Sequence, residues 1–389
     1  MNPVLSTGGR RFLGGVERNT GDREVNFGSI RASCAAVTSE VLKDLTARRW
    51  PGAEIDAERP LTGDAGNRSY VRLHLRGGAA PTTVLAMLFS ADGSARAPEE
   101  GGGPARDELP FVNVQRFLAA DAVAVPEIYL VAEAEGCLLL EDLGDAPLAQ
   151  VAEKSNDSER KTLMSQAVKL LARLATSESR ATMTSFALDQ TYGPEAIARE
   201  LTVTVTHGLG HAQGLGIRPA GADPELENAL ASLGDRVAAQ PVGLMHRDYH
   251  AWNLHVDPRG RLCVIDFQDA TRGPLLYDLA SLLTDRDTDR FVDPRLESEL
   301  LRVWREQMVE NGCPVYPDDT TLSEAYFTAV AYRTLRVIGR FGVLALELDK
   351  PGYFERYGPR MAQQTMRALD ALGEEHLADL LFQRSPIFS

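Results

Sequence analysis

The stretch that decides the fold runs from residue 244 to residue 285 and reads LMHRDYHAWNLHVDPRGRLCVIDFQDATRGPLLYDLASLLTD. Two apolar segments flank a Pro-Arg-Gly turn in its centre, a pattern typical of a β-hairpin. His246-Arg247-Asp248 precedes the hairpin, Asn253 follows Asp248 by five residues, and Asp266 ends the second strand. This order predicts that two aspartates and an asparagine are carried toward one point.

That trio suits phosphoryl transfer, which asks the protein mainly for positioning and for neutralisation of charge. Asp248 can accept the proton of an attacking hydroxyl, and Asn253 and Asp266 offer the hard oxygen ligands that Mg²⁺ prefers. The order is that of the protein-kinase template, except that Asp266-Phe267-Gln268 replaces the usual Asp-Phe-Gly. This difference favours the small-molecule relatives of protein kinases. Chance is a weaker explanation, because every part of the pattern occurs in order.

The wider pattern resembles the aminoglycoside phosphotransferase superfamily. Its parts are His246-Arg247-Asp248-Tyr249-His250, Asn253-Leu254, Asp266-Phe267-Gln268-Asp269-Ala270, Gly273-Pro274 and Tyr277-Asp278-Leu279-Ala280-Ser281-Leu282. The segment from Asp266 onward is most similar to the anomeric sugar kinase branch, which phosphorylates N-acetylmuramate and N-acetylglucosamine at the anomeric hydroxyl.

The resemblance implies a protein-kinase-like α+β fold of two lobes, with a small mixed sheet in the first lobe and a mainly helical second lobe. ATP and Mg²⁺ are the implied cofactors, and the sugar 1-phosphate product would enter cell-wall sugar recycling ahead of a uridylyltransferase. Asp248 is assigned as the catalytic residue, with Asn253 and Asp266 as metal ligands. His246 and Asp278 are assigned structural roles, the Asp278 carboxylate bracing the catalytic loop.

Two segments of the first lobe are predicted to bind the nucleotide. Residues 61–70 (LTGDAGNRSY) precede an alternating strand, and a glycine-containing turn there would let the backbone approach phosphates closely. It resembles the nucleotide loop of the same sugar kinases, although such a turn can also be only a turn. The segment 141–144 resembles the family's hinge, where backbone groups would meet adenine. The predicted nucleotide-binding residues are Gly63, Asp64, Gly66, Asn67, Arg68, Glu141 and Leu143.

The strand predicted at 82–89 (TTVLAMLF) lacks the lysine that the kinase template places there to meet the phosphates. Met87 or a neighbour takes its place. The phosphate charge must then be met by Mg²⁺, by backbone N–H groups or by another base. Arg68 and Arg72 are candidates for that base, although each could equally be a solvated surface arginine. The missing lysine also motivates an alternative, a non-catalytic nucleotide-binding protein.

The helix predicted at 322–348 supplies candidate substrate ligands. Arg333, Arg336 and Arg340 share one face, and the segment resembles a helix of the sugar kinases. Arg333 or Arg336 could hold the sugar or its lactyl carboxylate, since arginine grips carboxylates bidentately; a solvated basic stripe is the alternative. Asp269 could touch substrate or cap a turn. A kinase of an aminoglycoside, choline or homoserine stays open, although these arginines would oppose a cationic substrate.

Length and charge bound the remaining expectations. The 389 residues suffice for two lobes, which we place at 33–143 and 144–389 after a disordered extension at 1–32. A net charge of −14 argues against nucleic acid or an anionic membrane as the main partner and leaves a small-molecule substrate. No apolar run approaches the ~18 residues of a membrane span. Four cysteines without a CxxC pair fit a reducing cytoplasm.

Overall fold

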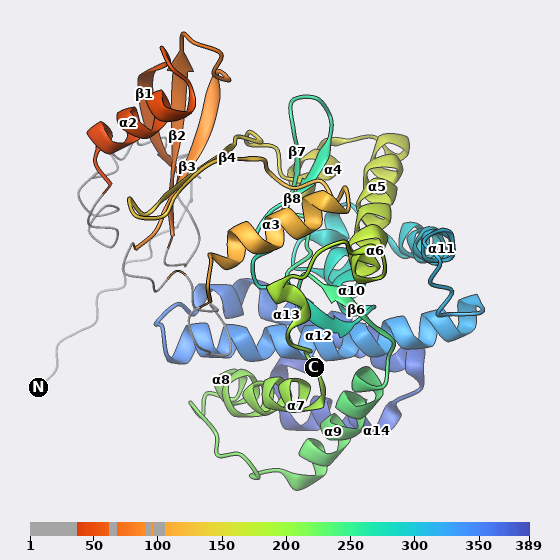
Figure 1. The fold of residues 1–389 in the computed structure, drawn as a ribbon. Helices are drawn as coiled ribbons and strands as arrows, with labels where there is room; N and C mark the ends of the chain where they lie inside the picture. The colour runs from red at the N-terminus through yellow and green to blue at the C-terminus, as the bar shows by residue number, and fades with distance from the viewer. Residues whose placement is uncertain (1–36, 62–67, 91–94, 96–105) are drawn as a thin grey trace, which may run out of the picture.

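The computed structural model describes residues 37–61, 68–90, 95 and 106–389. Its first lobe is built on a five-stranded sheet of order β1-β2-β3-β5-β4 (Figure 1). The strands are β1 Glu54–Leu61, β2 Ser69–Arg76, β3 Thr83–Leu88, β4 Ile128–Ala132 and β5 Cys137–Glu141. All four pairings are antiparallel, so the prediction of a mixed sheet was wrong in this detail. Short connections join β1 to β2, β2 to β3 and β4 to β5, and such connections cannot join parallel neighbours, whereas β3 pairs with β5 across the long connection that contains α3 and β4.

The two faces of this sheet bury different residues, as alternation along each strand requires. Val84, Ala86 and Leu88 of β3 pack with helix α2 (Ser39–Arg49) in one apolar cluster. Met87 points the other way and belongs to the main core, which continues through α3 (Pro110–Ala120) into the helical part of the chain. The sheet therefore turns one face to α2 and the other to the helical part of the chain.

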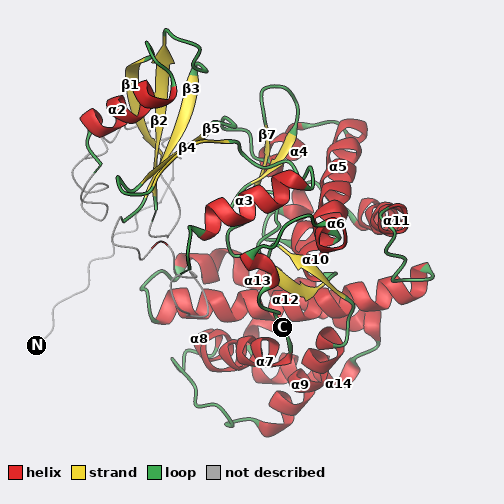
Figure 2. Cartoon of the chain, in the orientation of Figure 1, coloured by secondary structure: helices red, strands yellow, loops and turns green. Residues whose placement is uncertain are grey.

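Helices make up most of the second lobe (Figure 2). They are α4 Leu148–Lys154, α5 Asp157–Ala175, α6 Ser177–Arg180, α7 Pro194–Val203, α8 Gly210–Ala212, α9 Pro224–Ala238, α10 Tyr277–Thr284, α11 Pro294–Glu310, α12 Asp319–Leu346, α13 Gly352–Leu372 and α14 Glu375–Arg384. Two small antiparallel pairs lie among them, β6 (Val242–Met245) with β9 (Thr271–Pro274) and β7 (Leu254–Val256) with β8 (Leu262–Val264). The predicted hairpin around the Pro-Arg-Gly turn is the second of these pairs.

A π-helix, Thr204–Leu209, continues α7 and crosses α12 at very short range. A Cβ added at Gly339 would lie 2.8 Å from the backbone nitrogen of Thr204, and one added at Gly342 would lie 2.4 Å from the carbonyl carbon of His207. The Thr204 hydroxyl donates to the Leu335 carbonyl at 2.9 Å across the same crossing. Glycine on α12 thus lets two backbones touch, and this contact sets where the arginines of α12 lie.

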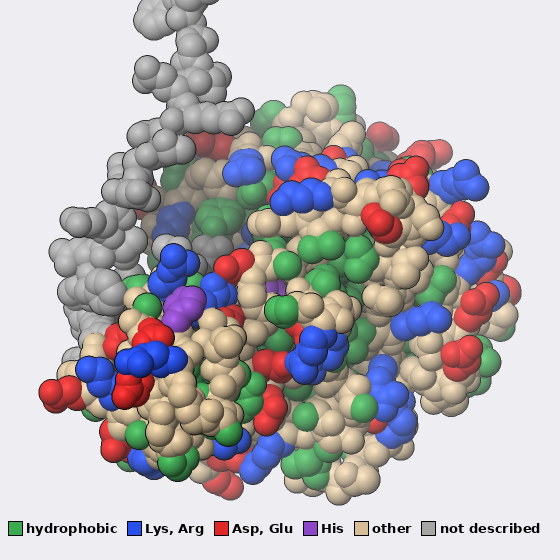
Figure 3. All heavy atoms as spheres, turned by 90° about the horizontal axis from the view of Figure 1, so that it is seen from above, with side chains coloured by type: hydrophobic (Ala, Val, Ile, Leu, Met, Phe, Trp, Pro, Cys, Tyr) green, Lys and Arg blue, Asp and Glu red, His purple; other side chains and the backbone are tan. Residues whose placement is uncertain are grey.

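The predicted lobe boundary at 143/144 lies between β5 and α4 and stays a prediction, and the predicted extension at 1–32 lies outside the described residues. On the face seen in Figure 3, lysine and arginine side chains are interspersed with aspartate and glutamate. Within the described ranges, no helix combines the length and the apolar character needed to cross a bilayer.

Candidate active site

The loop from His246 to Asn253 joins β6 to β7 and carries most of the site's chemistry. Its backbone is unusual at Arg247, whose φ of 79° lies in the left-handed region, and so does the φ of 62° at Asp266 after β8. For residues other than glycine, such conformations cost of order 1–3 kcal/mol and persist only where the surroundings impose them. Contacts with the surrounding protein must therefore hold these two residues in place.

His246 and Asp278 supply those contacts. The Nε2–H of His246 donates to the Ile265 carbonyl at 2.9 Å, and its Nδ1 accepts from the Asp248 N–H at 3.3 Å. The imidazole therefore ties the loop to the residue that precedes Asp266. The buried Asp278 carboxylate accepts from the N–H groups of His246 (2.5 Å) and Arg247 (3.0 Å). Burial raises its pKa to about 6, although the two hydrogen bonds and the nearby His246 act in the opposite direction.

Asp248, Asn253 and Asp266 line one cavity of about 890 Å³, as the motif predicts. The side-chain amide of Asn253 donates to the Asp248 carbonyl at 3.0 Å, and the Asn253 carbonyl accepts from the Ile265 N–H at 3.0 Å. The Asp266 carboxylate accepts from the Gln268 amide at 2.9 Å. Two strand ends and one loop thus present three oxygen-bearing side chains to the same space.

Asp248 is exposed to solvent on one side, and protein atoms surround its carboxyl group on the others. Desolvation alone would raise its pKa. The positive charge of Arg336, helped by His250, His246 and Arg333, outweighs that cost and holds the pKa below its usual value. Asp248 is consequently an ionised carboxylate at neutral pH, able to accept a proton.

Arg333 and Arg336 line the same cavity but are held by acids distant in the sequence. Arg333, only 3% exposed, donates to Asp285 at 2.9 Å. The Nε of Arg336 lies 3.3 Å from a Glu200 oxygen that also contacts Arg340. Both arginines are therefore brought to Asp248. Arg333 gives only its Nη2 to Asp285, and its Nε and Nη1 are buried without a hydrogen-bond partner among the described residues, so its role as a carboxylate ligand stays a prediction.

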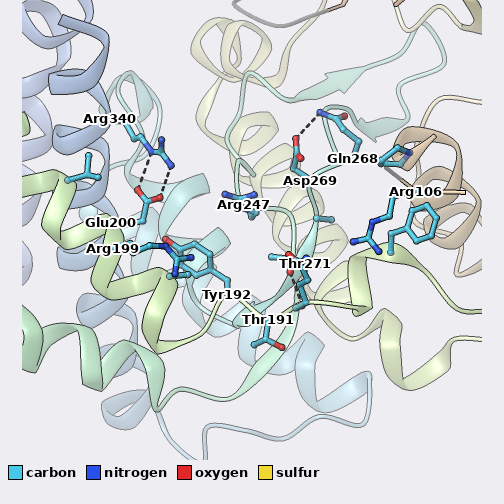
Figure 4. A pocket seen from close by; sticks show the side chains of 16 residues that line it. Arg106, Thr191, Tyr192, Arg199, Glu200, Arg247, Gln268, Asp269, Thr271 and Arg340 are labelled. Atoms are coloured by element: carbon cyan, nitrogen blue, oxygen red, sulfur yellow. Dashed lines mark hydrogen bonds and ion pairs between the residues drawn. The ribbon is translucent and has the colours of Figure 1, made fainter. Parts of the chain in front are cut away.

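Asp269 lies apart from them. It lines a second cavity of about 360 Å³ and accepts from the Gln268 amide at 3.3 Å (Figure 4). The predicted substrate residues are thus divided between two cavities that meet at Arg340, which lines both.

Comparisons with known proteins bear on this geometry. Residues 58–308 match the model of the phosphotransferase enzyme family. The chain belongs to this family. An N-acetylmuramate/N-acetylglucosamine kinase of Pseudomonas aeruginosa is 30% identical over 252 residues, covering 64% of this chain and 70% of the relative. A protein of the same description from Caulobacter vibrioides is 27% identical over 321 residues, covering 77% and 84%.

Solved structures support the same fold. A microcompartment-associated aminopropanol kinase matches with a TM-score of 0.53 at 14% identity, covering 87% of this chain and 99% of that one. An ADP-bound aminoglycoside phosphotransferase matches with a TM-score of 0.50 at 12% identity, covering 86% and 99%. The predicted kinase-like fold is confirmed. This phosphotransferase is a small-molecule kinase, so the non-catalytic alternative is not supported.

The nucleotide side of the kinase is described only in part. Gly63, Asp64, Gly66 and Asn67 lie outside the described residues. Arg68 is described, with its guanidinium carbon 6.0 Å from the centroid of the Phe111 ring. The predicted nucleotide role of these five residues stays a prediction.

The hinge contacts are clearer. The Glu141 carboxylate accepts from Arg259 (2.6 Å) and Arg261 (2.7 Å), and Leu143 is buried. The predicted role of Glu141 and Leu143 in adenine binding stays a prediction. Arg72, a candidate to replace the missing lysine, is instead bound at the hinge by Asp142 and Asp145 at 2.7–3.0 Å.

The side-chain oxygens of Asn253 and Asp266 are suited to a Mg²⁺ ion that enters together with the substrate phosphates. Because the Asn253 amide nitrogen already donates to the Asp248 carbonyl, its amide oxygen is the atom left to coordinate a cation. The Asp266 carboxylate is exposed and uses one oxygen for Gln268. Mg²⁺ is usually held by one or two such oxygens, together with waters and phosphates.

Sequence reasoning missed two acids that organise the site. Asp285 contacts both Arg333 and Arg286, and Arg286 lies 3.3 Å from the ring nitrogen Nε2 of His250. Asp285 ends the stretch quoted first, directly after α10, so its place in the motif was the available signal. Glu200 lies far from α12 in the sequence and gave no such signal.

Proposed function

We propose that this kinase uses Mg·ATP to phosphorylate the anomeric hydroxyl of N-acetylmuramate, N-acetylglucosamine or both. The observation that carries the proposal is the basic lining of the cavity that holds Asp248. Apart from Asp248 and Asp266, its acids are Asp285 and Asp287, against Arg286, Arg333, Arg336, Arg340 and Lys350. Such a lining favours an acceptor that is neutral or acidic, as these two sugars are, and agrees with the names of the curated relatives.

In the proposed reaction, the ionised Asp248 carboxylate orients the anomeric hydroxyl and takes its proton. The hydroxyl oxygen attacks the γ-phosphorus, and the bond to the leaving oxygen of ADP breaks. Asn253 and Asp266 would hold Mg²⁺, which supplies the neutralisation of phosphate charge. The buried bonds from Asp278 and His246 keep the loop in its strained conformation, so that Asp248 is already in place before substrate binds.

A cationic alcohol such as choline is the competing acceptor. Aromatic residues Phe341, Tyr353 and Tyr357 line the cavity, with ring centroids 6.2–6.3 Å apart, and could in principle attract a cation. However, Arg286 and Arg356 already lie over the Tyr357 ring, at 5.8 and 4.9 Å. Their charge would repel a quaternary ammonium, whereas the aromatic surface can still pack against a sugar ring.

The test is ³¹P NMR of the purified protein with Mg·ATP and, in separate samples, each sugar, an aminoglycoside and choline. We expect a new sugar 1-phosphate signal that disappears in Asp266→Ala and persists in Asp235→Ala, a matched change at an exposed position of α9. A signal only with choline or the aminoglycoside would overturn the sugar assignment. A sugar phosphate at another hydroxyl would overturn the anomeric assignment alone.

A further inference from the structure

The second cavity, of about 360 Å³, lies beside the catalytic loop and has no role in the reaction proposed above. In Figure 4, Arg340 and Glu200 stand on one side of it, Asp269 and Gln268 on the other, and Arg247 lies between them. Arg247 directly precedes Asp248, and Arg340 also lines the cavity of Asp248. The second cavity is therefore adjacent to the catalytic site without containing the catalytic carboxylate.

Its charge is opposite to that of the whole protein. Four arginines line it, Arg106, Arg199, Arg247 and Arg340, against two acids, Glu200 and Asp269. The net charge of the whole chain is −14, so this local excess of positive charge cannot come from average composition. A concave site lined by one sign of charge attracts ligands of the opposite sign.

Both acids are already in use. Glu200 accepts from Arg340 at 2.6 and 3.1 Å and lies 3.3 Å from Arg336, while Asp269 accepts from Gln268. Arg106 is itself paired with Asp189 at 2.5 Å. The protein's own carboxylates therefore do not neutralise the whole lining.

Arg199 differs from the other three arginines that line this cavity. It is an exposed residue of α7 that faces this cavity, and no hydrogen-bond or ion-pair partner for it exists among the residues that the structure describes. Its helix is well anchored, since α7 runs into the π-helix that packs against α12. The hydroxyl of Tyr192, which lines the cavity, forms a hydrogen bond of 2.6 Å with the hydroxyl of Tyr332, and this bond stiffens the cavity wall.

We infer that the second cavity binds a carboxylate and that Arg199 is its principal partner. A guanidinium can pair with a carboxylate through two parallel hydrogen bonds, and Arg199 has its donors free to do so. The carboxylate could belong to the acceptor itself, because N-acetylmuramate carries one that N-acetylglucosamine lacks, or to a separate small acid. The first source rests on the proposed function, while the second does not. In both cases Arg199 is the arginine that pairs with the carboxylate.

The experiment compares wild type, Arg199→Gln and Arg199→Lys, with Arg302→Gln on an exposed part of α11 as the matched control. Steady-state kinetics with N-acetylmuramate and with N-acetylglucosamine give KM and kcat for acceptors with and without the carboxylate. Isothermal titration calorimetry with N-acetylmuramate, N-acetylglucosamine and D-lactate measures binding without any requirement for turnover. Failure of the sugar kinase proposal would thus leave the binding test intact.

We expect Arg199→Gln to raise KM for N-acetylmuramate about tenfold to a hundredfold, the range for one charged hydrogen-bonded pair, without changing KM for N-acetylglucosamine. Arg199→Lys should recover part of the loss, and Arg302→Gln should show none. Loss of D-lactate binding with both sugars unaffected would assign the site to a separate acid. Equal effects on both sugars, or no effect on any of the three ligands, would overturn the proposal.

Discussion

The catalytic loop and strand β3 both correspond to places where the kinase template puts charged groups, and the two are built in different ways. The loop is held by buried polar contacts from His246 and Asp278. Strand β3 places Met87, 2% exposed, among apolar side chains. The cations that line the cavity of Asp248 come from α12, from Arg286 and from Lys350. The comparison teaches that positive charge is supplied here from the helical lobe, and that β3 serves as an apolar wall.

The largest test of this comparison removes the proposed proton acceptor, Asp248, from the loop. Asp248→Asn keeps the size and most contacts of the side chain but cannot take the hydroxyl proton. We expect kcat to fall by about 10²- to 10⁴-fold, the usual contribution of general base catalysis, with the circular dichroism spectrum of the folded protein unchanged. Steady-state assays and circular dichroism would measure both. Turnover near that of the wild type would remove Asp248 from the role of base.

The next test puts the template's lysine back into β3. Met87→Lys places an ammonium group in an apolar cluster, and desolvation opposes its charge. We expect the free energy of unfolding to fall by about 2–4 kcal/mol, with no gain in kcat/KM for ATP. Urea titration and kinetics measure the two effects. Met87→Leu is the control, for which less than about 1.5 kcal/mol should be lost. A stable Met87→Lys enzyme with improved kcat/KM would show that β3 is a phosphate-binding wall after all.

Local signals in the sequence were enough to predict that the three candidate reactive side chains lie together. Asp248, Asn253 and Asp266 come together because a short hairpin separates them, so their spacing alone carries the geometry. Helix α11, Pro294–Glu310, is likewise set by local features, because it is amphipathic and begins with proline. Helix α5 begins after the N-cap Asn156, which forms a capping box with Glu159, and this pattern is visible in the sequence.

Long-range packing explains what the sequence did not reveal. Strand β1 was not predicted, because it is an edge strand in which no side chain is fully buried and which contains Pro60. The π-helix packs against α12, and this contact joins segments that are far apart in the chain. Arg333 and Arg336 were predicted to bind substrate because only their own helix was visible. Their partners Asp285 and Glu200 come from other elements.

A smaller effect concerns the brace beneath the loop. Burial raises the pKa of Asp278 to about 6, above the ~3.9 of an unfolded aspartate. Its contribution to stability is therefore complete below about pH 4 and is lost as pH rises through 6. Relative to wild type, Asp278→Asn should gain up to about 3 kcal/mol in unfolding free energy between pH 4 and pH 7. Denaturant titrations at unit pH intervals measure this. A difference between the two proteins that does not vary with pH would contradict the raised pKa.

The smallest expected change tests how tightly the helical side is set. Gly342→Ala would put a Cβ 2.4 Å from the carbonyl carbon of His207, so α12 must move away from the π-helix. Overpacking of this kind typically costs about 1–3 kcal/mol. Because Arg336 and Arg340 lie on the displaced helix, KM for the acceptor should rise together with the loss of stability. Gly352→Ala is the matched control, since a Cβ there meets nothing within 4 Å, and it should stay within about 0.5 kcal/mol of wild type. If Gly342→Ala were destabilised while its KM stayed unchanged, the crossing would support the fold without positioning the arginines.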